Sequence, residues 1–177
     1  MLIHIPLLDA LLAPHAAALG RDAAGYRNHA YRVVNLGWSA GGGDDDAFRR
    51  LVIAAAFHDL GIWSARSFDY IAPSRALAGA HLQQIERAAW SDAVDRMIDN
   101  HHRVRRISMD HHDEAERFRR ADWADVSCGL LHGGFDADLL GSLRRTFPSH
   151  GFHCGLARRA LWRALTHPLD PLPMLRW

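Results

Sequence analysis

The feature that most constrains the fold of this chain is the spacing of its apolar residues. In almost every segment these residues recur at the three- and four-residue intervals of a helix, and few segments show the alternation typical of a strand. Helices with such an apolar stripe bury it against one another. The sequence therefore predicts an all-α protein, a helical bundle that forms a single domain over residues 1–177.

Glycines, prolines and capping residues divide the chain into predicted helices. The run Ala40-Gly41-Gly42-Gly43 ends one helix, and the aspartates that follow it can cap the next one. Residues 61–73 are predicted as a connector, and the proline-containing tail after residue 166 is predicted as an extended strap. The predicted helices span residues 5–19, 22–38, 46–58, 74–89, 92–104, 112–131, 136–146 and 153–166.

The charged residues are balanced, with 21 basic and 20 acidic side chains and a formal net charge of +1. This balance gives no reason to expect a nucleic acid or a membrane surface as a partner. Every basic residue is an arginine, which excludes a catalytic lysine. The first residues predict an amphipathic helix rather than a signal peptide, and no apolar run approaches the ~20 residues of a membrane span. Cys128 and Cys154 form no disulfide framework, so we expect a reduced, cytoplasmic setting.

Histidine is unusually frequent, with 13 copies in 177 residues. His29 lies in the middle of one predicted helix, and the pair His58-Asp59 follows a very apolar one. Asp122 lies in the middle of a third predicted helix. Because a buried carboxylate is costly without a positive partner, a divalent metal ion is an obvious partner for these groups. Imidazole and carboxylate ligands suit Fe, Mn, Zn, Co or Ni, and the carboxylates also admit Mg.

The order His29, His58-Asp59, Asp122 resembles the H…HD…D pattern of the HD superfamily of metal-dependent phosphohydrolases. The likeness extends over residues 26–126 and implies an HD-type helical bundle as the fold. It also implies that these four residues hold a first metal ion. In this interpretation residues 133–177 are C-terminal helices and a proline-rich tail of the same domain.

Further histidines suggest a second metal ion. Some HD families, including cyclic-dinucleotide phosphodiesterases and mixed-valent di-iron oxygenases, place two additional histidines between the HD pair and the last aspartate. His81 and His101 occupy the corresponding order here, and the resemblance implies that Asp59 bridges two ions. Periodicity does not decide between His101 and His102, and we favour His101 as the ligand. One or two metal ions are therefore expected.

The sequence departs from two well-defined HD subgroups. The phosphodiesterases carry a lysine shortly after the HD pair and a G-Y-P signature downstream, and this chain has neither. The bacterial 5′-nucleotidase branch carries a glutamate three residues after the HD aspartate, where this chain has Ile62. The substrate of neither subgroup can therefore be assigned by resemblance.

The resemblance implies hydrolysis of a small phosphorylated substrate, a nucleotide-like phosphomonoester or phosphodiester, by metal-activated water. Asp59 would be a catalytic ligand, and His102 would protonate the leaving group. Arg103 and Arg106 are candidate phosphate clamps, because arginine makes bidentate contacts to phosphate. Two alternatives stay open, namely an HD-type di-iron oxygenase resembling myo-inositol oxygenase and a non-catalytic metal-binding sensor.

Other residues are candidates for the surroundings of the metal ions. Asp125 lies on the same helical face as Asp122, and in the resembling families a second aspartate near this point often supports the site. Trp63, Phe68 and Tyr70, in the predicted connector, could form a wall over the metal ions or pack against neighbouring helices.

Overall fold

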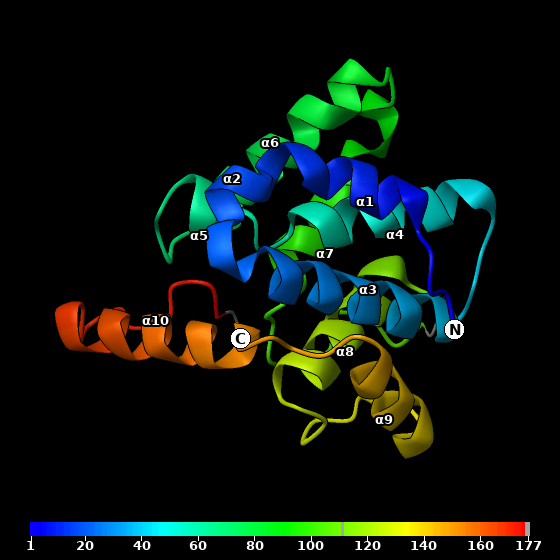
Figure 1. Cartoon of the computed structure of the whole chain (residues 1–177). Helices are drawn as coiled ribbons and strands as arrows, with labels where there is room; N and C mark the ends of the chain where they lie inside the picture. Colours follow the sequence, from blue (N-terminus) through cyan, green and yellow to red (C-terminus); the bar gives the residue numbers. More distant parts are fainter. Residues whose placement is uncertain (111, 176–177) are drawn as a thin grey trace.

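The structure is a computed structural model that describes residues 1–110 and 112–175 of the chain (Figure 1). These residues form one all-α body, and this part of the chain contains no strand, so the predicted class is confirmed. Its seven helices of ten residues or more are α3 (Ala23–Ser39), α4 (Asp45–Phe57), α6 (Ile71–Gln84), α7 (Ser91–Asn100), α8 (Glu114–Val126), α9 (Ala137–Thr146) and α10 (Phe152–Thr166). The shorter segments are α1 (Pro6–Leu12), η1 (Ala13–His15), α2 (Ala16–Leu19), η2 (Gly20–Asp22), α5 (Gly61–Ser64) and η3 (Ala88–Trp90).

The first predicted helix, residues 5–19, is interrupted in the structure. α1 ends at Leu12, and the 3-10 turn η1 separates it from α2. Pro14 lies in this turn, and because proline has no amide hydrogen it cannot continue the backbone ladder of α1. The prediction of one continuous helix was therefore wrong.

The helix predicted over residues 74–89 is displaced toward the N-terminus. α6 begins at Ile71, and Pro73 occupies its first turn, where backbone amides need no helical partner. The helix ends before Glu86, whose φ of 57° is left-handed. The predicted connector over 61–73 accordingly contains α5 and the first turn of α6.

The remaining differences concern helix ends and the tail. α7 ends at Asn100, four residues before its predicted end at residue 104. α8 begins after the cap residue Asp113 and stops short of residue 131, because Cys128 and Gly129 have left-handed φ values of 54° and 80°. The tail folds in turns up to residue 175 instead of forming an extended strap, and its last two residues lie outside the described part.

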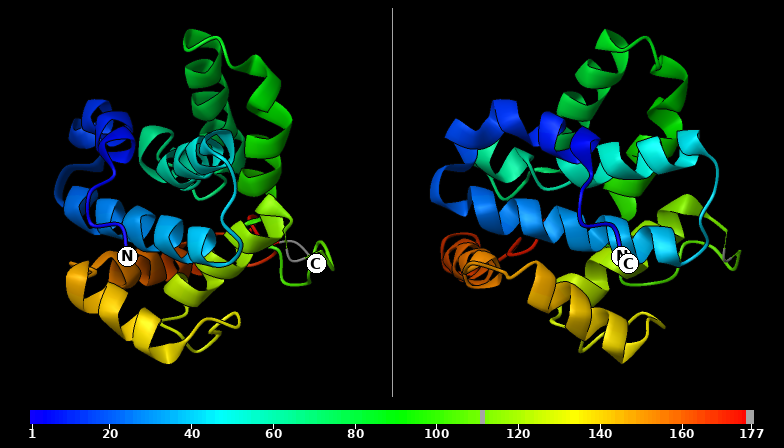
Figure 2. Two further views of the ribbon diagram at one scale, coloured as in Figure 1. Left: turned by 90° about the vertical axis from the view of Figure 1, so that its right-hand side faces the viewer. Right: turned by 45° about the vertical axis from the view of Figure 1, so that its right-hand side comes forward.

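α3 lies at the centre of the molecule, packed against α4 and α8, while α7 packs against α4, α6 and α8. In Figure 2, α6 and α7 rise on one side of this group and α9 lies on the opposite side. α3 also buries four polar side chains at helical spacing, which are Asn28, His29, Arg32 and Asn35. Because buried polar groups need partners, this face of α3 marks where the bundle holds a polar site.

α4 delivers the HD pair into the interior. Every residue from Leu51 to Phe57 is buried, and a helix that is apolar all round must lie inside the protein. His58 and Asp59 follow directly at its buried end. None of the described helices, α4 included, is long and apolar enough to cross a membrane.

α10 packs its first residue, Phe152, into the core, and Phe152 is the one residue of this helix that is buried. A Cβ atom at Gly25 of α3 would lie 2.7 Å from the carbonyl oxygen of Ser149 and 2.9 Å from Cβ of Phe152. Glycine at this position thus allows the start of α10 to approach α3. The rest of α10 extends along the outside of the molecule (Figure 1).

Candidate metal centre

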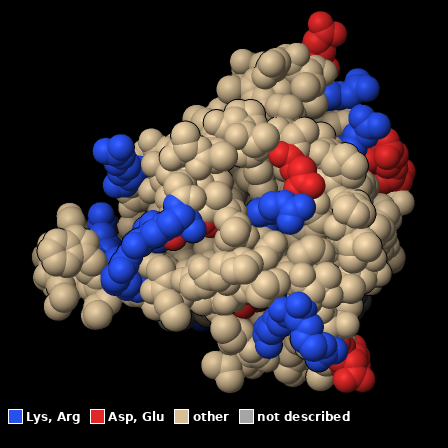
Figure 3. Space-filling model, viewed as in Figure 1, with Lys and Arg blue, Asp and Glu red and all other residues tan. Residues whose placement is uncertain are grey.

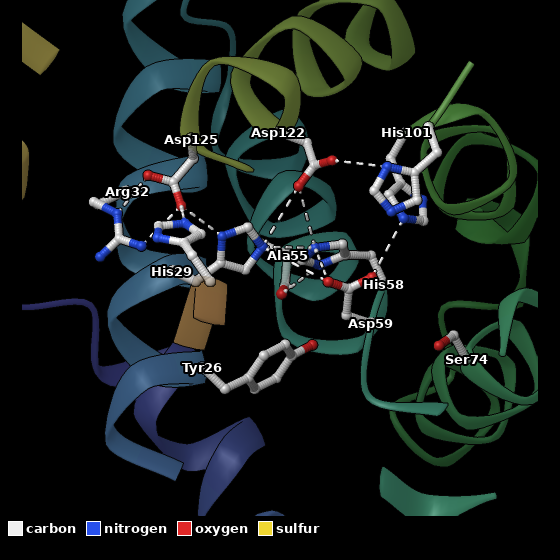
Figure 4. A network of polar contacts seen from close by, with 12 residues as sticks. Tyr26, His29, Arg32, Ala55, His58, Asp59, Ser74, His101, Asp122 and Asp125 are labelled. Carbon is white, nitrogen blue, oxygen red and sulfur yellow. Dashed lines mark hydrogen bonds and ion pairs between the residues drawn. The ribbon is translucent and has the colours of Figure 1, made fainter. Parts of the chain in front are cut away.

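Four helices meet around a buried cluster of histidine and aspartate side chains (Figure 4). α3 contributes His29 from its middle, and α4 is followed directly by His58 and Asp59. His101 follows the last residue of α7, and Asp122 belongs to α8. These five residues are at most 1% exposed, so the cluster lies in the protein interior.

The first group of ligand candidates contains His29, His58, Asp59 and Asp122. The Nε2 atoms of the two histidines are 3.0 Å apart. Oδ1 of Asp122 lies 3.5 and 3.6 Å from these two nitrogens, and Oδ2 of Asp59 lies 3.9 and 3.5 Å from them. Ligand atoms that share an ion at about 2.1 Å are themselves about 3.0–3.4 Å apart. His29, His58 and Asp59 are close enough together that they could hold one metal ion, with Asp122 beside the two histidines.

The second group contains Asp59, His101 and His102, whose ligand atoms all lie within 4.8 Å of one another. Nε2 of His101 is 3.4 Å from Oδ1 of Asp59, the oxygen that does not face the first group. Nδ1 of His102 is 3.5 Å from Oδ2 of Asp122. The carboxylates of Asp59 and Asp122 therefore both lie between the two groups. In each carboxylate, one oxygen faces the first group and the other faces the second group.

The carboxylates also lack partners of the ordinary kind. Both oxygens of Asp59 and both oxygens of Asp122 are buried, and no hydrogen bond reaches them within the described residues. Their contacts with the histidines, at 3.4–3.9 Å, are longer than hydrogen bonds. Four unpartnered carboxylate oxygens in the interior are costly, and a divalent cation would satisfy them. The donor set therefore fits a bound metal.

Backbone and side-chain acceptors orient three of the histidine rings. Nδ1 of His58 is 3.0 Å from the carbonyl oxygen of Ala55, and Nδ1 of His101 is 2.6 Å from that of Ile98. Nδ1 of His29 is 2.7 Å from Oδ2 of Asp125. A hydrogen on each Nδ1 leaves the lone pair on Nε2, which is the nitrogen that faces the cluster.

Asp125 joins His29, a candidate ligand, to the positive charge of Arg32. The guanidinium of Arg32 donates to both oxygens of Asp125, and both residues are almost fully buried. Nε2 of His153, in α10, lies 3.5 Å from the same carboxylate. The contact of Asp125 with His29 agrees with the supporting role suggested by its position one turn after Asp122. Arg32 lies one helical turn after His29, on the same face of α3. This spacing is the sequence signal that could have identified Arg32 as a partner of Asp125.

The pKa values of the cluster reflect burial opposed by neighbouring charges. Burial lowers the pKa of His58, but Asp59 and Asp122 outweigh it and raise that pKa to about 9. Burial raises the pKa of Asp59, but His58 and His101 together bring it well below its usual value. Burial and then His101 lower the pKa of His102 to about 4. Without a metal ion, a proton on His58 offsets one of the two carboxylate charges, and metal binding must displace that proton.

Tyr70 is a further member of the site. Its hydroxyl lies 2.7 Å from Nε2 of His102 and 3.4 Å from Nε2 of His101, and the residue is 1% exposed. Sequence reasoning offered Tyr70 only as part of an aromatic wall, since nothing in the spacing shows that it reaches the second pair of histidines. Tyr70 is the residue just before α6, and the position of that helix start places its hydroxyl beside His101 and His102.

His81, predicted as a ligand of the second ion, belongs to neither group. It lies in the last turn of α6, with its ring 5.7 Å from that of Phe57. Among the described residues, the groups whose ligand atoms lie within 4.8 Å of one another do not include His81.

Arg103 and Arg106, the predicted phosphate clamps, lie in the segment after α7. The carbonyl oxygen of Arg103 accepts hydrogen bonds from Arg119 and Trp123, which ties this backbone to α8. The guanidinium of Arg106 is half-exposed and lies 3.7 Å from a carboxylate oxygen of Glu116. Their part in binding phosphate stays a prediction.

The class of protein defined by this fold and site is an all-α protein with buried clusters of histidine and aspartate that can bind metal. No family model, no curated protein and no solved structure matches the chain.

Proposed function

We propose that this protein is a metal-dependent phosphohydrolase of the HD type, acting on a small phosphorylated compound. The observation that carries the proposal is the position of Asp59. One of its oxygens faces His29 and His58 and the other faces His101, so a single carboxylate is shared by two groups of ligands. Paired metal sites of this kind recur in enzymes that hydrolyse phosphate esters.

Divalent ions held by these residues would supply Lewis acidity and make water a nucleophile at neutral pH. The chain itself fixes the ligand geometry, through the Nδ1 contacts of His29, His58 and His101. Burial of the cluster excludes bulk water and strengthens the interaction of a phosphate ester with positive charge.

His102 fits the role of a ligand better than its predicted role as a proton donor. Its pKa of about 4 keeps the ring neutral at pH 7, and a neutral imidazole can coordinate a metal but has no proton to spare for a leaving group. With a side chain 12% exposed, it is also the member of the cluster that solvent reaches. We therefore assign both His101 and His102 to the second group.

The test is metal-dependent release of phosphate or alcohol from p-nitrophenyl phosphate, bis(p-nitrophenyl) phosphate and nucleoside monophosphates. Protein would be assayed with Mn, Co, Ni, Zn, Fe and Mg in turn, and the metal content measured on the same samples. The variant Asp59→Ala should lose bound metal and at least about 1000-fold of the activity, since it removes the shared ligand. Asp138→Ala, at an exposed position of α9, is the matched control and should keep both.

Other outcomes separate the alternatives. Retention of both metal and activity by Asp59→Ala would refute the site. Bound iron with a mixed-valent signal, together with oxygen consumption and no hydrolysis, would replace the proposal by an oxygenase, because the shared carboxylate suits that chemistry as well. Metal-loaded protein that hydrolyses none of these esters and consumes no oxygen would favour a binding role.

A further inference from the structure

A second hollow of the molecule lies apart from the metal centre. It has a volume of about 710 Å³ and is formed by α5, the loop that follows it, and α10. This volume is in the range of cavities that bind small organic molecules. None of the residues that line it belongs to either group of metal ligands. Trp63 and Phe152, stacked 6.2 Å apart, lie between this cavity and the ring of His29.

The charge around the cavity is positive. Four arginines line it, one from the loop after α5 and three from α10, which are Arg66, Arg158, Arg159 and Arg163. Arg159 is paired with Asp22 at 2.7 Å and Arg163 with Asp170 at 3.2 Å. Arg66 and Arg158 have no ion pair or hydrogen bond with the described residues. In Figure 3 basic side chains gather on the left of the view, between the positions of α5 and α10, with few acidic ones beside them.

Two free guanidinium groups across a hollow form a site for an anion. Arginine binds phosphate by two parallel hydrogen bonds, and each phosphate oxygen accepts more than one. Arg66 and Arg158 come from different elements, so a ligand between them would be held from both sides. Arg159 and Arg163 are each paired with an aspartate, so the free positive charge at the cavity belongs to Arg66 and Arg158.

Aromatic rings form the rest of the lining. Trp63, Phe68 and Trp162 border the cavity. Trp63 is buried and has the guanidinium of Arg159 over its ring at 5.1 Å, so this face is already occupied. Trp162 is 69% exposed, although it is the largest apolar side chain of α10. An exposed indole at the rim of a basic cavity is suited to stack on a planar ring of a bound molecule.

We propose that this cavity binds a nucleotide, with its phosphates between Arg66 and Arg158 and its base against Trp162. The inference is independent of the proposed hydrolysis, because it concerns binding at residues that are not part of the metal centre.

The experiment is isothermal titration calorimetry on the full chain with adenosine α,β-methylene diphosphate, a nucleotide whose bridging bond resists hydrolysis. We expect saturable binding of one molecule after the metal has been removed with a chelator, so that the metal centre does not bind the ligand as well. Arg66→Gln and Arg158→Gln should each weaken it about tenfold, which is the ratio expected from losing one charge-assisted contact at an exposed site. Arg145→Gln, which changes an exposed arginine of α9 that does not line the cavity, is the matched control and should bind as the wild type does.

A second arm separates the base from the phosphates. Trp162→Ala should weaken the nucleotide about tenfold and leave the affinity for methylene diphosphonate, the same charged group without a nucleoside, unchanged. The four altered residues are exposed, so the variants should fold, and far-ultraviolet circular dichroism would verify this.

The proposal is overturned if no saturable binding is found below 1 mM ligand, or if Arg145→Gln weakens binding as much as Arg158→Gln. It is also overturned if chelation of the metal abolishes binding, since the nucleotide would then occupy the metal centre. Equal weakening of methylene diphosphonate by Trp162→Ala would refute the contact of this ring with the base.

Discussion

His29, His58 and His101 turn the same ring nitrogen, Nε2, toward the metal centre. In each case an acceptor at Nδ1 selects this orientation, and for His29 the acceptor is the carboxylate of Asp125. The other two acceptors are backbone carbonyls within the histidine's own helix, which no side-chain change can remove. Asp125 is therefore the point where the support of the ligands can be tested by substitution.

Asp125→Asn should lower the affinity for metal by about 10- to 100-fold, the usual cost of losing a carboxylate behind a ligating histidine. The amide fits in the same space but leaves the buried guanidinium of Arg32 without a counter-charge. The measurement is competition for metal with a chromophoric chelator. Asp138→Asn, on the surface of α9, should keep the wild-type affinity. Equal affinities of the wild type and Asp125→Asn would contradict the role.

His81 and His101 form a natural pair for counting metal ions, since one lies outside the cluster and the other inside it. Protein purified without added metal should contain about two equivalents, as expected for a shared carboxylate. His101→Ala should reduce the content to about one, because the second group loses a ligand. His81→Ala should leave it unchanged. A loss of metal from His81→Ala equal to that from His101→Ala would show that the arrangement around α6 is incorrect.

At the scale of elements, α8 carries Asp122 and Asp125, so its position decides where both carboxylates lie. Its N-terminus is capped by Asp113, which accepts from the amides of Ala115 and Glu116. Arg96 of α7 donates to the same carboxylate at 2.7 Å. The side chain of Asp113 thus caps the start of α8 and ties it to α7, the helix that precedes His101.

Asp113→Ala should lower the free energy of unfolding by about 0.5–2 kcal/mol, the range measured for loss of an N-cap. Burial raises the pKa of Asp113, but its bonds to the amide of Glu116 and to Arg96 outweigh it and lower that pKa below 3.8. The stabilisation is therefore complete above about pH 4 and declines as the pH falls through the pKa of the folded state. Urea denaturation at pH 7 and pH 3 would measure both effects.

The comparison for this prediction is Asp113→Asn, which keeps an oxygen for the cap but loses the charge that pairs with Arg96. At pH 7 its free energy of unfolding should lie between those of the wild type and Asp113→Ala. Since Asp113→Asn has no carboxyl group to protonate, it should not lose the stability that the wild type loses when Asp113 is protonated. If the urea concentration at the midpoint of unfolding were the same for Asp113→Ala and the wild type at pH 7, the role of Asp113 as a cap would be refuted.

For the whole molecule, the metal centre connects α3, α4, α7 and α8 at the middle of the bundle. A metal ion that binds the folded state stabilises it by mass action, by about 2.7 kcal/mol at a free concentration 100 times the Kd. For a chain of this size that corresponds to an increase in Tm of about 5–10 °C. We expect the chelated protein to melt at the lower temperature and to recover on addition of metal.

Differential scanning calorimetry would measure this shift, with Asp59→Ala as the variant that should show none. A wild-type Tm that is the same with and without chelator would contradict a metal ion at the centre of the bundle. Because the Tm reports binding and not turnover, this result is independent of the hydrolase assay.

Much of the fold was predictable because its determinants are local. The apolar periodicity identified all seven long helices, and caps such as Asp44 placed several starts within a residue of those observed. One kind of error arises where a single residue overrides the periodic pattern, as Pro14 does between α1 and α2. Another arises at Pro73, which is predicted to precede a helix but lies within the first turn of α6, where proline is tolerated.

The sequence by itself determined the helical class and the order of His29, His58-Asp59 and Asp122, since both are patterns along the chain. The resemblance had already implied that Asp59 is shared by two ions, but only the tertiary structure shows which side chains lie together: His101 and His102 lie beside Asp59, the hydroxyl of Tyr70 lies beside His102, and His81 is in neither group. His29 and Asp125 are 96 residues apart, and their contact depends on how α3 packs against α8. Helix packing and ring orientation arise from side chains distant in the chain, so no local pattern can reveal them.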